Sequence, residues 1–161
     1  GQVPIFYNHK NTGRPEGFYE SVFITKYLDS PNQPLFPFGY GLSYTTFEYS
    51  EIQMEDKQLT RDGKLNVSVK VKNTGKYKGT ETVQLYIRDL VASVTRPVKE
   101  LKSFRKVELK PGEEKKVEFV ITEKDLRFWN DKKQFISEPG KFHLFIGTDS
   151  ENVKKAEFVL L

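Results

Sequence analysis

The stretch KLNVSVKVKN, from Lys64 to Asn73, alternates apolar and polar residues without a break. Successive side chains of a strand point to opposite faces, so this pattern places leucine and the valines on one face and lysine, asparagine and serine on the other. The segments TVQLYIRD, KKVEFVIT and KFHLFIG repeat the pattern, and AEFVLL supplies a last strand. Strands with one dry and one wet face are typical of antiparallel sheets. The residues expected to point inward are Leu65, Val67, Val69, Val71, Val83, Leu85, Ile87, Val117, Phe119, Ile121, Phe142, Leu144 and Ile146.

Turn signals separate these strands. NTGKYKG, from Asn73 to Gly79, links two strongly alternating segments and predicts a hairpin. KPGE (110–113) and EPGK (138–141) each set proline before glycine, which favours a type II turn with a positive φ at the glycine. Several short strands with regular turns predict an all-β antiparallel sandwich, preceded by an extended N-terminal segment.

Two segments depart from simple alternation. TEKDLRFW, after Ile121, predicts a single helical turn capped by Thr122. VKELKSFRKVEL shifts phase between Leu101 and Leu109, which indicates two strand pieces joined by a bulge, with a short helix as the alternative.

Composition excludes several classes of protein. The chain of 161 residues has no cysteine, which rules out disulfide frameworks, thiolate metal sites and a cysteine nucleophile. Its formal charge of +4 is spread over lysine pairs beside carboxylates, which indicates solvated strand edges and no nucleic-acid footprint. It has no apolar run long enough to span a membrane. The opening GQVPIFY lacks an initiator methionine, so we expect an excised piece whose targeting signal would lie upstream.

The segment PLFPFGYGLSYTTFEY, from Pro34 to Tyr49, carries more aromatic surface than a solvated loop should expose. Its prolines and glycines exclude a helix. Phe47 and Tyr49 are expected to begin the first strand of the sandwich. Residues 1–33 are apolar without a clear period apart from one candidate strand, VPIFYN, and are too few to form a core of their own. We expect them to pack on the sandwich or on a second copy of the chain.

Several long motifs carry a family resemblance. PLFPFGYGLSYTTFEY, KVKNTGKYKGTETVQLYIRD, TRPVKELKSFRKVELKPGEEKKVEFVIT, DLRFW and EPGKFHLFIG together resemble the C-terminal region of glycoside hydrolase family 3 enzymes, the β-glucosidase and β-xylosidase group. The resemblance implies an immunoglobulin- or fibronectin type III-like sandwich over residues 47–161. It makes residues 34–46 an aromatic interdomain linker and residues 1–33 the remnant of a preceding α/β sandwich domain.

The resemblance implies no catalytic residue in this chain. The family's retaining mechanism uses an aspartate nucleophile on an N-terminal barrel and a glutamate acid/base usually on the α/β sandwich domain, and neither motif occurs here. The parent would be a periplasmic or secreted bacterial β-glucosidase, acting on terminal β-D-glucosyl residues, or an enzyme of the β-xylosidase type. The chain would be its accessory module, bracing the catalytic domains of the same chain, with a homodimer interface as a further candidate role. Docking would fall to Phe36, Phe38, Tyr40 and Tyr44.

The residues themselves offer no acid/base pair. A retaining glycosidase needs two carboxyl groups about 5 to 5.5 Å apart, one of them in a dry pocket. The nearest pairs in sequence are Glu113 with Glu114 and Asp149 with Glu151, and both lie beside turns where solvated surface is expected. His9 and His143 stand in no catalytic or metal-ligand spacing, and His143 is expected to be an exposed strand residue. We therefore expect no cofactor and no metal.

One alternative comes from the aromatic residues near position 129. Phe128 and Trp129, with Phe135, suit a platform that stacks on sugar rings, whereas the competing interpretation is that they fill the end of the sandwich. The platform would make the chain an independent carbohydrate-binding or adhesive module. Without such a platform, we expect small oligosaccharides to be bound only by the parent enzyme and not by this chain itself. That the chain is itself an enzyme is a third hypothesis, with almost no support in the residues.

Overall fold

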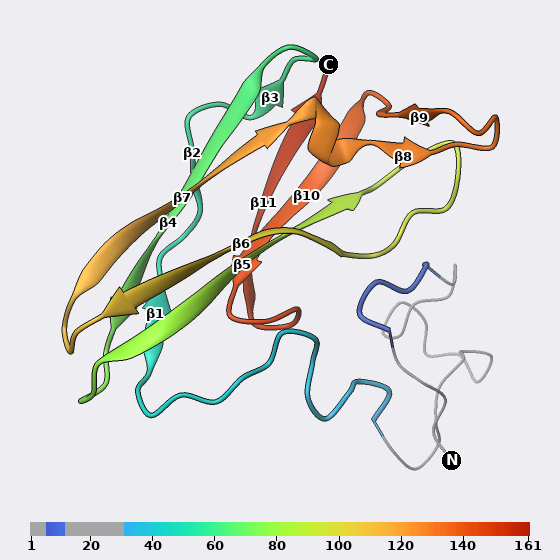
Figure 1. The fold of residues 1–161 in the computed structure, drawn as a ribbon. Coiled ribbons are helices and arrows are strands. Elements are labelled where there is room, and N and C mark those ends of the chain that lie inside the picture. Colours follow the sequence, from blue (N-terminus) through green and yellow to red (C-terminus); the bar gives the residue numbers. More distant parts are fainter. Residues whose placement is uncertain (1–5, 12–30) are drawn as a thin grey trace, which may run out of the picture.

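The structure is a computed structural model that describes residues 6–11 and 31–161. Two sheets pack face to face, and a small hairpin stands apart from both (Figure 1). No helix formed by the described residues is long and apolar enough to cross a membrane. The elements are β1 (Phe47–Tyr49), β2 (Gln53–Met54), β3 (Gln58–Leu59), β4 (Lys64–Asn73), β5 (Gly79–Asp89), β6 (Glu100–Leu109), β7 (Glu114–Thr122), the 3-10 turn η1 (Glu123–Leu126), β8 (Phe128–Trp129), β9 (Phe135–Ile136), β10 (Gly140–Gly147) and β11 (Val153–Leu160).

The first sheet is built around β4. Val71 faces Tyr49 of β1 on one side and Lys115 of β7 on the other, and β2 continues the line of β1 along the same edge of β4. The second sheet has the order β3-β11-β10-β5-β6, with every pair antiparallel except β3 with β11. The antiparallel β-sandwich is therefore confirmed.

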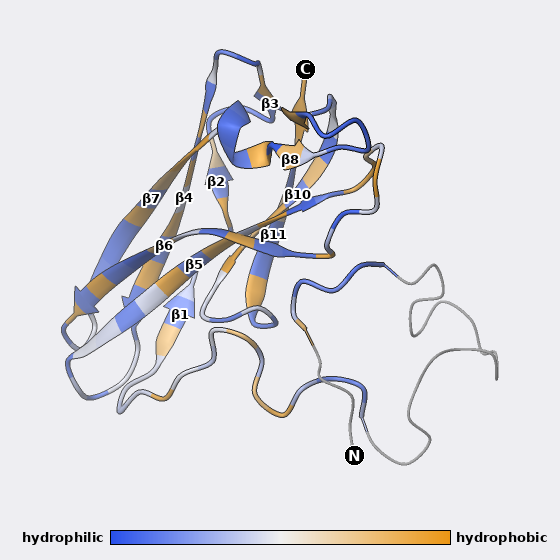
Figure 2. Ribbon diagram, turned by 45° about the vertical axis from the view of Figure 1, so that its right-hand side comes forward, coloured by the Kyte–Doolittle hydropathy of each residue, from blue (hydrophilic) through white to orange (hydrophobic). Residues whose placement is uncertain are grey.

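The core lies between the two sheets, and hydrophobic and hydrophilic residues alternate along β4 and β7 (Figure 2). All thirteen residues expected to point inward are buried. Phe142 of β10 stacks on Phe158 of β11, with ring centroids 5.3 Å apart. Phe47 and Tyr49 belong to β1 and pack against this core, as predicted.

The predicted hairpin at residues 73–79 is wrong. β4 lies in the first sheet and β5 in the second, so the loop between them crosses from one sheet to the other. Alternation identifies both strands but does not say whether consecutive strands pair, and here β4 pairs with β1, β2 and β7 whereas β5 pairs with β6 and β10. Such crossings are what close a two-sheet sandwich.

Three further local predictions have mixed outcomes. Gly112 has φ of +76°, and the N–H of Glu113 donates to the carbonyl of Lys110 at 3.0 Å, which confirms the turn at KPGE. The type II turn predicted at EPGK is wrong, because Gly140 has no positive φ and already pairs with Leu160 as the first residue of β10. The bulge is confirmed, since the pairing of β5 with β6 shifts register there and β6 is otherwise continuous.

Candidate functional site

The segment 34–46, which we name the aromatic strap, crosses one end of the sandwich (Figure 1). Its predicted docking residues Phe36, Phe38, Tyr40 and Tyr44 are all exposed, from 44% for Tyr40 to 96% for Tyr44. Phe36 leans on Tyr40 with ring centroids 5.1 Å apart. Exposed aromatic rings gathered on one segment mark a surface that another body is able to cover.

The strap is held by its main chain. Gly39 has φ of +83°, which only glycine adopts readily, and a Cβ there would overlap the side chain of Gln84. The Gln84 amide, buried on β5, donates to the Gly39 carbonyl at 3.1 Å and also to the Thr148 carbonyl. The N–H of Ser150 donates to the Phe38 carbonyl at 2.9 Å. Fixing the backbone in this way leaves most of the strap's rings directed away from the sandwich.

Residues 6–11 pack on the same surface. The ring of Tyr7 stacks on Phe38, with centroids 4.0 Å apart, and meets the edge of Tyr86. The N–H of Val98 donates to the carbonyl of His9 at 2.9 Å. For these few residues the sandwich's own surface, one of the two predicted partners, is the one observed. Most of residues 1–33, including residues 3–5 of the predicted strand VPIFYN, lies outside the described residues. In the other half of that segment the predicted strand is wrong, because Phe6, Tyr7 and Asn8 lead into a turn in which the N–H of His9 donates to the Phe6 carbonyl at 3.2 Å.

This cover explains a burial pattern that alternation did not predict. Gln84 and Tyr86 lie on the face of β5 that was expected to be wet, yet both are buried. The Tyr86 hydroxyl donates to Gln84 at 2.6 Å, so the two side chains satisfy each other under the strap. The predictable signal was the bulky Tyr86 at a nominally polar position of TVQLYIRD.

The hairpin β8–β9 divides the predicted sugar platform. Phe128 is only 3% exposed, and the guanidinium of Arg96 lies 4.4 Å from its ring centroid. Phe128 therefore fills the end of the sandwich. Trp129 is 66% exposed and Phe135 49% exposed, and their ring centroids are 5.3 Å apart. The structure brings together Trp129 and Phe135, and the predicted partnership of Phe128 with Trp129 on one surface is absent.

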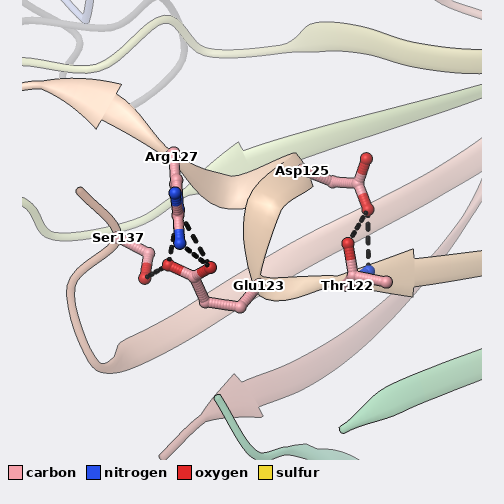
Figure 3. A network of polar contacts seen from close by, with 5 residues as sticks. All are labelled: Thr122, Glu123, Asp125, Arg127 and Ser137. Carbon is pink, nitrogen blue, oxygen red and sulfur yellow. Dashed lines mark hydrogen bonds and ion pairs between the residues drawn. The ribbon is translucent and has the colours of Figure 1, made fainter. Parts of the chain in front are cut away.

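One carboxylate fastens both ends of this hairpin (Figure 3). Glu123, buried in η1, accepts two hydrogen bonds from Nε of Arg127, at 2.9 and 3.0 Å, and one from the hydroxyl of Ser137 at 2.6 Å. Arg127 immediately precedes β8 and Ser137 immediately follows β9. The hydrogen bonds from Arg127, and then from Ser137, hold the pKa of Glu123 below its ordinary value. Thr122 is the N-cap residue of η1, as predicted, and the Asp125 carboxylate accepts both its N–H and its hydroxyl.

One of the carboxylates singled out in the sequence stabilises a turn. Asp149, expected to be solvated, is buried. It accepts the N–H groups of Glu151 and Asn152, each at 2.8 Å, and so organises the turn between β10 and β11. Among the described residues, no group of three or more histidine, aspartate and glutamate side chains is placed to hold a metal ion. None of this geometry resembles a general acid facing a nucleophile.

His143 is another correction. Its side chain is mostly covered and contacts Glu157 across the β10–β11 pair at 3.0 Å, instead of standing exposed. Burial lowers the pKa of His143. A neighbouring strand partner covers the imidazole, which period-two alternation alone does not reveal.

Asp89, at the end of β5, is the carboxyl with the clearest shift. Burial raises its pKa from 3.8 to about 6, against the opposing effects of the Val91 N–H and of Arg96, while Glu138 and Glu100 add to the rise. Its Oδ2 is buried without a hydrogen-bond partner among the described residues. A folded-state pKa above the unfolded value means that this carboxyl opposes folding as pH rises through about 6.

We expect Asp89→Asn to raise the free energy of unfolding at pH 8 by about 1–2 kcal/mol, a figure reduced for partial solvent screening. The gain should vanish near pH 4, where the native carboxyl is already protonated. Urea unfolding of both proteins at the two pH values checks this, with Asp62→Asn on an exposed turn as the control. Equal stabilisation at both pH values would contradict the assignment.

An antiparallel sandwich of this strand order is a fibronectin type III-like fold. A family model described as a fibronectin type III-like domain matches residues 81–150. A periplasmic β-glucosidase from Salmonella typhimurium is 49% identical over 162 residues, which cover 100% of this chain and 21% of the relative. A putative β-xylosidase from Formosa agariphila is 45% identical and covers 99% of this chain and 20% of the relative.

The solved structures agree. A β-glucosidase from Listeria innocua in complex with glucose superposes with a TM-score of 0.89 at 42% identity, covering 98% of this chain and 22% of that one. The chain belongs to the fibronectin type III-like region of glycoside hydrolase family 3 proteins. It spans about a fifth of the length of the relatives it matches and corresponds to a small, non-catalytic portion of them.

Proposed function

We propose that the chain braces the catalytic domains of a family 3 β-glucosidase and that the aromatic strap is the docking surface. The observation that carries this proposal is the exposure of Phe36, Tyr40 and Tyr44 on a segment whose backbone is fastened to the sandwich. Covering such rings contributes about 1.5–3 kcal/mol each. Phe38 already has a partner in Tyr7, so it contributes less of the free surface.

The whole protein's substrate is proposed by likeness. The relatives include β-glucosidases and a putative β-xylosidase, so we propose that the parent hydrolyses terminal β-D-glucosyl residues, with β-xylosides as the second candidate. The Salmonella relative is called periplasmic, which supports a periplasmic or secreted bacterial parent. A second copy of the chain remains a candidate partner for the same exposed strap.

Two measurements test this function. The 161-residue chain should not release p-nitrophenol from p-nitrophenyl β-glucoside above background, and turnover would overturn the non-catalytic assignment. In the whole protein, the triple change Phe36→Ser, Tyr40→Ser and Tyr44→Ser should lower the melting temperature and expose the strap to protease. The same change should leave the melting temperature of the 161-residue chain nearly unaltered.

The control is Phe104→Ser, which removes another exposed ring, this one on the edge strand β6. It should leave the whole protein as stable as the native one. An unchanged whole protein after the triple strap change would contradict the docking role. Light scattering of the isolated chain separates the other candidate: loss of a dimer in the triple variant would assign the strap to a second copy.

A further inference from the structure

Trp129 and Phe135 form an exposed aromatic pair that the bracing role does not use. Their rings are tilted by 40° and lie on the hairpin β8–β9, at the end of the sandwich opposite the aromatic strap (Figure 1). Exposing large apolar rings to water is unfavourable, and covering them is favourable. A contiguous exposed pair therefore points to a binding surface.

The hairpin that carries the pair is rigid at both ends. Glu123 fastens its two feet through Arg127 and Ser137 (Figure 3). At the tip, Oδ1 of Asn130 accepts the N–H groups of Lys132, at 3.0 Å, and Gln134, at 2.9 Å. A stacking site benefits from such preorganisation, because little conformational freedom remains to be lost on binding.

The size of the patch argues against a protein partner. Two rings offer at most about 300–500 Å² of surface. A stable protein interface buries about 800 Å² on each partner. A pyranose ring, by contrast, is about the size of one aromatic ring and presents C–H groups to it.

The chemistry around the pair also suits a sugar. Asn130, Asp131, Lys132 and Gln134 lie at the tip beside the rings, and the last three are exposed. They supply amide, carboxylate and ammonium groups that hydrogen-bond hydroxyls at the rim of an apolar face. Phe128 is excluded, because it is buried beneath Arg96.

We propose that Trp129 and Phe135 form a stacking platform for the pyranose rings of a β-linked gluco-oligosaccharide. Glu123 acts as a positioning residue for this platform, because it holds both feet of the hairpin. The choice of β-glucosides as the sugar rests on the proposed function, whereas the stacking geometry does not. A mutant β-glucosidase from Listeria innocua, 41% identical with a TM-score of 0.90, has been solved in complex with laminaribiose, which makes that disaccharide a fitting first probe.

The test uses the fact that Trp129 is the chain's only tryptophan. Titration of the 161-residue chain with laminaribiose, cellobiose and xylobiose should change the tryptophan fluorescence saturably, with the largest change for the two glucose disaccharides. In parallel, amide shifts from two-dimensional NMR should move at residues 127–137 and stay fixed along β4.

Variants then separate the contributions. Measured by NMR, Trp129→Ala should weaken binding by about tenfold or more and Phe135→Ala by a smaller factor, while Trp129→Tyr should retain part of the affinity. Glu123→Gln, which keeps the shape of the side chain and removes its charge, should weaken binding and raise hydrogen exchange in the hairpin. Phe104→Ala should bind as the native chain does.

No saturable change with any of the three sugars would overturn the platform, and so would an affinity in Trp129→Ala equal to that of the native chain. A change in Trp129 fluorescence that appears as the protein concentration rises, in the absence of sugar, would identify a second copy of the chain as the occupant. That result would also overturn the sugar platform. The p-nitrophenyl β-glucoside and strap experiments are independent of these results. Failure of the platform is therefore distinguishable from failure of the bracing role.

Discussion

Replacing Asn73 with alanine is expected to lower the free energy of unfolding by about 3–5 kcal/mol. Asn73 is 0% exposed, and its side chain makes four hydrogen bonds. Its oxygen accepts the Thr45 hydroxyl at 2.6 Å and the Gly75 N–H at 3.0 Å. Its amide donates to the carbonyls of Tyr77, at 2.8 Å, and Leu109, at 3.0 Å.

The cost is large because the four partners belong to different parts of the fold. They come from the end of the aromatic strap, the loop between the sheets and the end of β6. Without the Asn73 side chain, each of these groups would lose a hydrogen-bond partner in a largely buried environment. Urea unfolding measures the loss, with Asn66→Ala, an exposed residue on the same strand, as the control. A loss below about 1 kcal/mol would show that water replaces the amide freely.

The second large effect is expected for Phe142→Ala, at about 3–5 kcal/mol. Phe142 is buried between the sheets and stacked on Phe158, so truncation leaves a cavity that the strand pairing on both sides keeps from collapsing. The chain has no disulfide to compensate. Thermal and urea unfolding should both register the loss.

Phe104→Ala is the matched control, because its ring is 54% exposed on β6. It should change stability by no more than about 0.5 kcal/mol. Similar losses in the two variants would mean that the packing between the sheets is not what stabilises this sandwich.

The strands and their inward faces were predictable because alternation acts residue by residue. Val83, Leu85 and Ile87 point inward whichever strands pair with β5. The crossing after Asn73 was not predictable, since the same NTGKYKG signal fits a hairpin and a loop between sheets. The bulk of Tyr86 at a nominally polar position indicates that something covers it, but the residues that do so are far away in the chain and no local pattern identifies them.

The candidate sites were likewise predictable only in part from the sequence. The strap's rings could be identified from their number alone, but the main-chain anchors at Gly39 and Gln84 required the structure. In the two-residue strand β8, Phe128 points inward and Trp129 outward. Two residues show too little alternation for the sequence to reveal which of them is buried. Glu123 was not singled out, although the capped turn that contains it was predicted.

The anchoring of the strap through Gly39 has a consequence for how such modules diversify. The sandwich contacts the strap there through backbone atoms and the Gln84 amide, so the sandwich places no demand on the identity of the outward rings. Under the proposed docking role, substitutions at Phe36, Tyr40 or Tyr44 would follow changes in a neighbouring domain without repacking the sandwich. On that proposal the fold and its outward contacts would evolve separately, and one sandwich would suit parents with different neighbouring domains.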